Sequence, residues 1–106
     1  MKDQKGYFYI LTNIRNNVLY AGSTKNIIKR VKEHQRTNRK GFVQKYNINR
    51  LICYEISENI GEAKQREKQV KGWKRERKIE LIESKNKQWK DLCAELKERD
   101  PSLRSG

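Results

Sequence analysis

The stretch YFYILTNIRNNVLYAG, residues 7–22, decides the fold expected of this chain. Aromatic and β-branched residues dominate residues 7–12, and an apolar run returns at residues 18–21. Between them, residues 13–17 include three Asn. This pattern is typical of two strands joined by a polar turn. We therefore predict a β-hairpin that ends at Gly22.

A helix and a third strand are expected after the hairpin. Ser23 or Thr24 can cap a helix that runs from about residue 26 to about residue 37. Residues 42–46 are expected to form a short helical or irregular turn. The apolar run at residues 50–56 predicts a third strand that is central in the sheet or covered on both faces.

The last third of the chain is expected to be helical. Helices are predicted over residues 60–71 and 73–83, on either side of Gly72. Residues 88–99 form an amphipathic stretch, whose shared face carries Trp89, Leu92, Cys93 and Leu96. Together these elements predict an α/β (α+β) fold, in which a small, mostly antiparallel three-stranded sheet is flanked by helices.

Positive charge dominates this 106-residue chain, which has 26 Lys and Arg against 13 Asp and Glu, a formal net charge of +13. Nine basic residues and one acid lie between residues 25 and 50, and eight basic residues and two acids between residues 64 and 78. Such clustering predicts a polyanionic partner. A basic surface that serves solubility and an anionic membrane surface are the alternatives.

No segment resembles a membrane span or a secretory signal. The apolar runs are far shorter than the ~18 residues that a bilayer requires, and residues 1–5 are polar. We therefore expect a cytoplasmic protein with no membrane partner. Cys53 and Cys93 are far apart and lack a CxxC or Cys/His pattern, so we expect reduced, structural thiols.

A carboxylate lies on the apolar side of the helix predicted over residues 60–71. Ile60, Ala63 and Val70 mark that side, and the position four residues after Ala63 is Glu67. Burying an unpaired carboxylate is costly, so we expect a cation, a metal or a water-filled cleft beside Glu67. An ion pair with a neighbouring basic residue is the purely structural alternative.

Polar side chains also lie on the apolar side of the preceding helix. Ile27, Val31 and His34 share one face, and Arg30 lies at its margin. Tyr9 and Tyr20 are expected to lie nearly opposite each other across the hairpin, which is also typical of simple cross-strand packing. These groups become a candidate site only if they converge with Glu67.

The ordered motifs of the chain resemble the GIY-YIG nuclease superfamily, particularly its small stand-alone branch. The segments that carry the resemblance are Tyr7-Phe8-Tyr9-Ile10-Leu11, Leu19-Tyr20-Ala21-Gly22-Ser23-Thr24, Arg30 with His34, Gly41-Phe42-Val43-Gln44-Lys45-Tyr46-Asn47, Arg66-Glu67-Lys68-Gln69-Val70-Lys71-Gly72-Trp73, and Leu81-Ile82-Glu83-Ser84-Lys85-Asn86 with Trp89. They span about residues 6–92. The first motif lacks its usual glycine, and Ala21 replaces the branched residue usual before Gly22.

The resemblance implies a three-stranded antiparallel sheet flanked by helices, and hydrolysis of nucleic-acid phosphodiester bonds with one divalent metal, Mg²⁺ or Mn²⁺. It implies a nuclease domain at residues 1–92, followed at residues 93–106 by the end of a C-terminal helix and a frayed tail. The catalytic set that it implies is Glu67 as the metal-binding carboxylate, Arg30 at the scissile phosphate, the paired Tyr9 and Tyr20, His34, and Asn86.

The chemistry expected of that set is consistent with the residue types. Mg²⁺ prefers oxygen ligands and retains waters, so Glu67 and phosphate oxygens can bind it without further carboxylates. The planar, permanently charged Arg30 suits the developing phosphoryl charge. Tyr9 is assigned as the base, positioned by Tyr20 and His34, although a phenol of pKa near ~10 needs its phenolate to be favoured.

The expected partner is DNA, with RNA as an alternative. The side chains expected to bind it are Lys25, Lys29, Arg30, Lys45, Lys71 and Lys74. Binding through phosphates is salt-sensitive and carries little sequence information. We therefore expect an endonuclease with little intrinsic sequence specificity, which recognises DNA shape or relies on a protein partner. The resemblance implies no particular oligomeric state.

Two rival functions belong to other classes. The first is a basic nucleic-acid-binding module that has lost catalytic turnover. The second is a protein-interaction module that uses a surface made by Trp73, Trp89 and Leu92.

Overall fold

The computed structural model describes residues 5–13, 15–36, 48, 50–93 and 95–96. Its elements are, in chain order, β1 (Gly6–Thr12), β2 (Leu19–Thr24), α1 (Ile27–Arg36), β3 (Arg50–Ser57), α3 (Ile60–Lys71) and α4 (Arg75–Lys85). The strands form one antiparallel sheet in the order β2-β1-β3. The expected α+β fold is therefore confirmed. The turn predicted at residues 42–46 lies outside the described residues.

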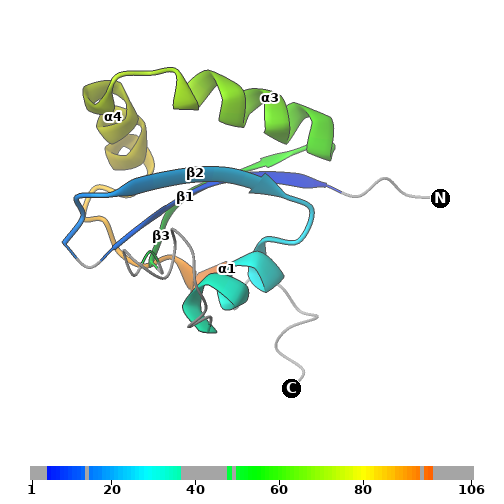
Figure 1. The fold of residues 1–106 in the computed structure, drawn as a ribbon, viewed down its shortest axis with the longest axis horizontal. Helices are drawn as coiled ribbons and strands as arrows, with labels where there is room; N and C mark the ends of the chain where they lie inside the picture. The colour runs from blue at the N-terminus through cyan, green and yellow to red at the C-terminus, as the bar shows by residue number, and fades with distance from the viewer. Residues whose placement is uncertain (1–4, 14, 37–47, 49, 94, 97–106) are drawn as a thin grey trace.

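The helices cover both faces of the sheet, as Figure 1 shows, with α3 and α4 on one side and α1 on the other. Alternation along the strands divides the apolar residues between two clusters. On the α1 side, Tyr9 and Leu11 pack with Val31, whereas on the α3 side Phe8 and Ile10 pack with Val70. The sheet is thus the shared wall of two small cores.

The β1–β2 hairpin is closed by its asparagines. The side-chain oxygen of Asn13 accepts hydrogen bonds from the backbone N–H groups of Asn17 (3.1 Å) and Val18 (3.3 Å). Asn16 has a φ of 58°, the left-handed region that Asn tolerates better than most residues. The predicted hairpin is therefore present, but β2 continues to Thr24 instead of ending at Gly22.

Helix α1 starts one residue later than expected and has a different cap. The side chain of Asn26 accepts a hydrogen bond from the backbone N–H of Lys29 at 3.0 Å, as an N-cap residue does. Thr24 instead accepts from the backbone N–H of Asn26 at 3.1 Å. Because the cap is Asn26, Ser23 remains in the strand with its hydroxyl available for another partner.

Strand β3 is covered on both faces but is an edge strand. Leu51 belongs to the α1-side core and Ile52 to the α3-side core, with a register shift beside them in the β1–β3 pairing. The central strand is β1. The outer edge of β3 is covered by the segment after α4, where the backbone N–H of Leu92 donates to the carbonyl of Leu51 at 2.7 Å.

The predicted amphipathic stretch at residues 88–99 is only partly present. Trp89 has a φ of 58° and packs against the α3-side core, whereas Leu92, Cys93 and Leu96 pack on the α1 side. A helical turn begins only near Leu92, whose carbonyl accepts from the backbone N–H of Leu96 at 2.9 Å. The expectation that Trp89 shares a face with the other three residues was therefore wrong, because the chain reverses at Trp89. Residues 97–106 lie outside the described part.

Both cysteines are buried and neither is in a disulfide, as expected of reduced, structural thiols. Among the described residues, no helix combines the length and the hydropathy needed to cross a bilayer.

Helix α4 begins at Arg75, two residues later than predicted, because Gly72 ends α3 and donates its backbone N–H to the carbonyl of Gln69.

Gly6 is expected to be essential for stability because β1 starts directly against the beginning of α3. A Cβ at Gly6 would lie 2.6 Å from the backbone carbon of Asn59 and from Cα of Ile60, which is closer than van der Waals contact allows. We predict that Gly6→Ala lowers the free energy of unfolding by roughly 1–3 kcal/mol, as for other overpacked sites. Chemical denaturation measures this change.

Gly72→Ala is the matched control for Gly6→Ala. A Cβ at Gly72 would meet no atom closer than 3.5 Å, and the backbone there has an ordinary φ of −84°. A loss of stability in Gly72→Ala as large as that in Gly6→Ala would contradict the proposed steric cause.

Candidate active site at the edge of strand β2

The site is built around Tyr9, which lies on the central strand β1 and has a fully buried side chain. Its partner across the β1–β2 ladder is Gly22. A Cβ at Gly22 would lie 2.5 Å from the Tyr9 hydroxyl, so the ring crosses β2 through the space that the missing side chain leaves. Gly22 thereby lets a residue of the central strand present its hydroxyl at the sheet edge.

Tyr20 lies on the same face as Tyr9 but not opposite it. Its partner across the ladder is Leu11, two pairs along from Tyr9–Gly22, so the two tyrosines, expected to lie nearly opposite each other, are diagonal neighbours on one face. The turn at residues 13–17 sets this register. The half-buried Tyr20 packs against the α1-side core.

Arg30 reaches the Tyr9 hydroxyl from α1. Its Nη1 donates to Tyr9 Oη at 3.4 Å. Burial raises the pKa of Tyr9 above its ordinary value, and although the positive charge of Arg30 acts in the opposite direction, burial prevails. The Tyr9 phenol is therefore protonated at neutral pH in the free protein, and the structure does not by itself favour the phenolate.

Glu67 lies on the side of α3 that faces the sheet, between the fully buried Ala63 and Val70. Its side chain is 21% exposed. Oε1 accepts a hydrogen bond from the Ser23 hydroxyl at 2.6 Å, and Oε2 lies 2.6 Å from Nζ of Lys71. The protein alone therefore shows the ion pair with a neighbouring basic residue that was the purely structural alternative.

Glu67 is held in its ionised form. Burial by itself raises the pKa of Glu67, but the hydrogen bonds from Lys71 and Ser23, together with the charges of Lys71 and Lys64, lower it below the ordinary value. Glu67 is thus ionised and partly exposed, and another cation can replace the ammonium group of Lys71 at its Oε2.

The two halves of the site meet around β2. Tyr9 and Arg30 approach from the α1 side, whereas Glu67 approaches from the α3 side and is bound to Ser23, the residue after Gly22. The negative charge of Glu67 contributes to the raised pKa of Tyr9, so the two groups are within electrostatic reach of each other. Three of the predicted residues therefore lie around Gly22 and Ser23 of β2, Tyr9 and Arg30 on one face of the sheet and Glu67 on the other.

Asn86 does not join them. It is buried beyond α4, where its amide nitrogen donates to the carbonyls of Ile52 (2.9 Å) and Lys90 (2.7 Å) and its amide oxygen accepts from the backbone N–H of Lys90 (2.9 Å). Because β3 and β2 are opposite edges of the sheet, Asn86 lies across the sheet from Glu67. Its contacts close the chain over β3, so we leave Asn86 out of the proposed catalytic set.

The remaining predicted residues are exposed lysines or have side chains outside the described part. His34 belongs to α1, but its side chain is not among those described, and Lys45 lies outside the described residues. Lys25, Lys29 and Lys74 are exposed, and the side chain of Lys71 is 55% exposed.

Sequence reasoning missed Ser23. It was expected as one of two possible helix caps, and its bond to Glu67 joins residues 44 positions apart. The available signal was its position: on β2, Ser23 follows Gly22 and so points to the face opposite Tyr9, where α3 lies.

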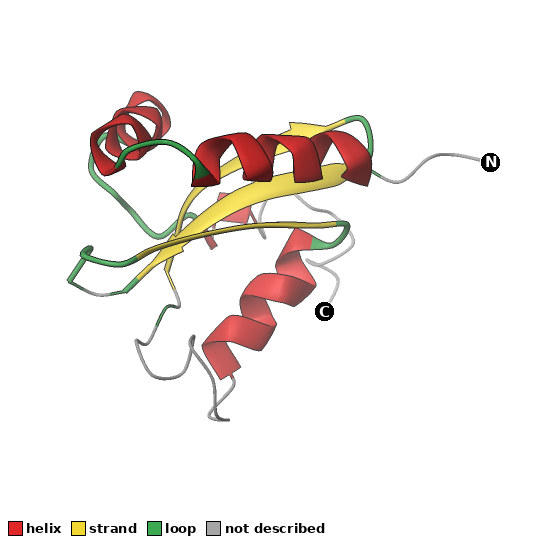
Figure 2. Ribbon diagram, turned by 45° about the horizontal axis from the view of Figure 1, so that its top comes forward, coloured by secondary structure: helices red, strands yellow, loops and turns green. Residues whose placement is uncertain are grey.

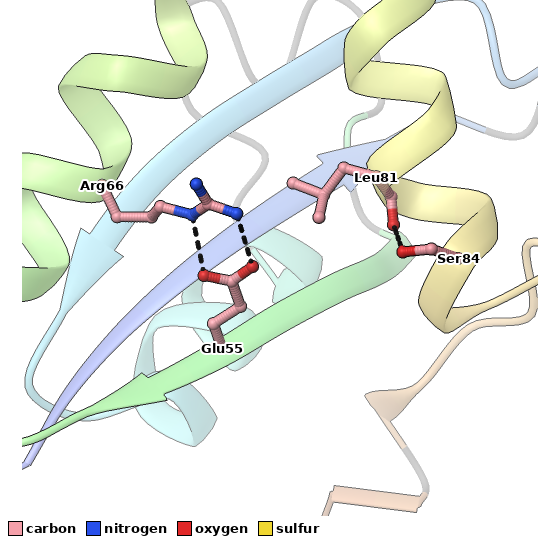
Figure 3. Close-up of polar contacts among 4 residues, drawn as sticks. All are labelled: Glu55, Arg66, Leu81 and Ser84. Atoms are coloured by element: carbon pink, nitrogen blue, oxygen red, sulfur yellow. Dashed lines mark hydrogen bonds and ion pairs between the residues drawn. The ribbon is translucent and has the colours of Figure 1, made fainter.

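The surface proposed for a protein-interaction module does not exist as one surface. Leu92 packs on the α1 side of the sheet, whereas Trp73 and Trp89 pack on the other side. The Trp73 ring is stacked with two guanidinium groups, those of Arg66 (5.2 Å) and Arg77 (4.1 Å). Arg66 is held in turn by a two-pronged ion pair with Glu55 on β3 (Figure 3).

The side chains near Glu67 determine which kind of metal ion this part of the protein could bind. Within the described part of the chain, no three His, Cys, Asp or Glu side chains are grouped closely enough to bind a metal ion by themselves. A closed zinc-type site is therefore not formed by these residues. Glu67, as one ionised carboxylate at a partly exposed position, fits a hard divalent cation that takes its other ligands from water and phosphate.

Comparisons with known proteins agree with the fold and with the family that the motifs resemble. The family model of the GIY-YIG catalytic domain matches residues 5–80. The chain is 38% identical over 84 residues to the UPF0213 protein CPE1444 of Clostridium perfringens, a match that covers 76% of this chain and 85% of that protein. Its fold is similar to the solution NMR structure of the UPF0213 protein BH0048 from Bacillus halodurans, with a TM-score of 0.53 and 24% identity over 83% of this chain and 93% of that one.

The lowered pKa of Glu67 predicts a pH dependence of stability. A carboxyl group whose pKa is lower in the folded than in the unfolded chain stabilises the fold above its unfolded pKa, and this contribution is lost as the pH falls through the folded value. We predict that Lys71→Met raises the pKa of Glu67 and so reduces the stability lost on acidification below the ordinary value of 4.5.

The measurement is a carbon-detected NMR titration of the Glu67 carboxyl group, together with chemical denaturation across the acid range. Lys68→Met, at an exposed position on the same helix, is the control. An unchanged Glu67 pKa in Lys71→Met would show that the ion pair does not control this carboxylate.

Proposed function

This chain belongs to the GIY-YIG family of nuclease domains, and from that premise we propose that it is a divalent-metal-dependent endonuclease that hydrolyses DNA phosphodiester bonds. The observation that supports the proposal is that Tyr9 with Arg30 and Glu67 lie on either side of two adjacent residues of β2, Gly22 and Ser23. A phenol, a guanidinium and an ionised carboxylate are the groups needed to position a water, neutralise a phosphate and bind a hard cation.

Glu67 is the proposed ligand of Mg²⁺ or Mn²⁺. Its Oε1 is fixed by Ser23, whereas its Oε2 contacts a lysine whose side chain is more than half exposed and can move away. When bound, the cation supplies positive charge that stabilises the phosphate and acidifies the attacking water. Lys71, once released from Glu67, is free to pair with a phosphate of the substrate.

Arg30 is the proposed partner of the scissile phosphate. Its contact with the Tyr9 hydroxyl, at 3.4 Å, is longer than a strong charge-assisted bond, so it can be exchanged for a phosphate oxygen at little cost. The guanidinium stays charged at any working pH and offers two parallel donors. A lysine at this position would provide the charge without that geometry.

Tyr9 is the proposed proton acceptor for the attacking water. Because burial raises its pKa, only a small fraction is ionised at neutral pH, but a phenolate of high pKa is a strong base once formed. Arg30 is the charged group that favours the ionised form. Tyr20 and His34 are proposed to position this group, as the family resemblance implies.

The exposed lysines around the site support DNA as the substrate. Lys25 and Lys29 lie at the beginning of α1, and Lys71 and Lys74 lie at the junction of α3 and α4. These contacts would be to phosphates, so we propose binding that is salt-sensitive and carries little sequence specificity.

The decisive test is cleavage of supercoiled plasmid DNA with Mg²⁺ or Mn²⁺. We predict that Glu67→Gln, which keeps the size of the side chain but removes its charge, lowers the cleavage rate at least about a hundredfold. Glu62→Gln, an exposed position on the same helix, is the control and should cut like the unmodified protein. Residual cutting that is equal in all three proteins would indicate contamination, and DNA binding without cutting would favour the inactive binding module.

The role of Tyr9 predicts a pH profile. If the phenolate accepts the proton, kcat/KM rises up to about tenfold per pH unit between about pH 7 and 9, because the ionised fraction rises by that factor below the pKa. We predict that Tyr9→Phe lowers kcat/KM and flattens this rise. Tyr54→Phe, a phenol on the neighbouring strand β3, is the control. An equally steep profile in Tyr9→Phe would assign the base to another group.

A further inference from the structure

A cavity of about 270 Å³ opens on the α3 side of the sheet, next to the site. It lies between the β1–β2 hairpin and the helices α3 and α4, which cover the same face of the sheet in Figure 1. The residues that line it are Ile10, Leu19, Tyr20, Ala21, Val70, Lys71 and Lys78. Its walls are thus mainly apolar and its charged groups are two lysines, with no acid among the lining residues.

The cavity adjoins the proposed catalytic carboxylate. Lys71 lines it and at the same time contacts Oε2 of Glu67 at 2.6 Å. Tyr20 also borders it, between the lining residues Leu19 and Ala21 on β2, although the Tyr20 side chain packs on the α1 side of the sheet. A ligand in the cavity therefore lies one lysine side chain away from Glu67.

Ala21 keeps this space open. It is half-buried on β2, lies opposite Ile10 across the ladder, and takes the position before Gly22 where a branched residue is usual in the motif. A branched side chain here would project into the cavity beside Ile10 and Val70. The departure from the motif that the sequence shows is thus also the feature that leaves the cavity unfilled.

We propose that this cavity is a subsite for one unpaired nucleobase of the DNA, next to the phosphodiester that is cut. The inference rests on the proposed nuclease function and narrows its substrate to DNA with an unpaired nucleotide at the cleavage position. The apolar walls receive the faces of the base, and Lys71 and Lys78 pair with the adjoining phosphates.

The composition of the cavity favours an unpaired base over the surface of a duplex. In a duplex, the faces of each base are covered by its neighbours in the stack, and only its edges and the phosphates are accessible. The half-buried side chains of Leu19 and Ala21 offer no hydrogen bonds to base edges, but they can cover an exposed base face. The two lysines match the charge of the strand that would enter.

The test compares two fluorescent DNA duplexes that differ by a single-nucleotide flap, bound with Ca²⁺ in place of Mg²⁺ and followed by fluorescence anisotropy. We predict that the unmodified protein binds the flap duplex about tenfold more tightly, within the range found for one stacked base. Ala21→Ile, which fills the cavity, should reduce this preference to about threefold or less while leaving binding of the blunt duplex unchanged.

A second variant protects the test against misfolding of Ala21→Ile. Lys78→Met removes one lysine of the cavity on α4 and should also weaken binding of the flap duplex selectively. Lys85→Met makes the same change two turns later on α4, outside the cavity, and is the matched control. Thermal unfolding establishes that each variant is folded.

The outcomes separate the two proposals. Equal flap preference in the unmodified protein, Ala21→Ile and Lys78→Met, or no flap preference at all, overturns the subsite even if plasmid DNA is cut. Absence of cutting by the unmodified protein on every substrate overturns the nuclease function, whereas a flap preference that Ala21→Ile abolishes still supports the subsite.

Discussion

The packing of the Tyr9 ring across Gly22 is the contact on which the rest of the site depends. Tyr9 belongs to the central strand, and a residue there would ordinarily be enclosed between a helix and the neighbouring strand. Because Gly22 has no side chain, the ring extends over β2 and its hydroxyl reaches the edge. Arg30 can then contact it from α1. The site is therefore anchored on the central strand of the sheet, and the Tyr9 hydroxyl lies over the edge strand β2.

Two consecutive residues of β2, Gly22 and Ser23, contact the groups on the two faces of the sheet. Gly22 makes room for Tyr9 on one face, and Ser23, which points to the other, binds Glu67. Because consecutive residues of a strand face opposite sides of the sheet, the contacts with α1 and with α3 are made by neighbouring residues of β2. This arrangement explains why the charge of Glu67 influences the phenol of Tyr9 although the two side chains belong to different layers of the fold.

The opposite edge of the sheet is closed, and this leaves the β2 edge for function. Asn86 and the segment up to Leu92 satisfy backbone groups of β3, and Arg50 adds a hydrogen bond to the carbonyl of Trp89 at 2.6 Å. Figure 2 shows that α3 runs alongside the sheet, with α4 beyond one of its ends. An exposed strand edge is prone to pair with other chains, so covering β3 also protects the fold.

The sequence by itself determined the elements, because strand and helix periodicities are local and are set by neighbours within a few residues. The pattern also marked Glu67, because a carboxylate on an apolar face is visible in the sequence alone, whereas the roles expected of Tyr9 and Arg30 came from the resemblance to a family. Only the tertiary structure decided the bond of Ser23 to Glu67, the place of Asn86 at the far edge and the cavity at Ala21. Each of these depends on which side chains, distant in sequence, share one small space, and that is fixed by the packing of the layers and not by local periodicity.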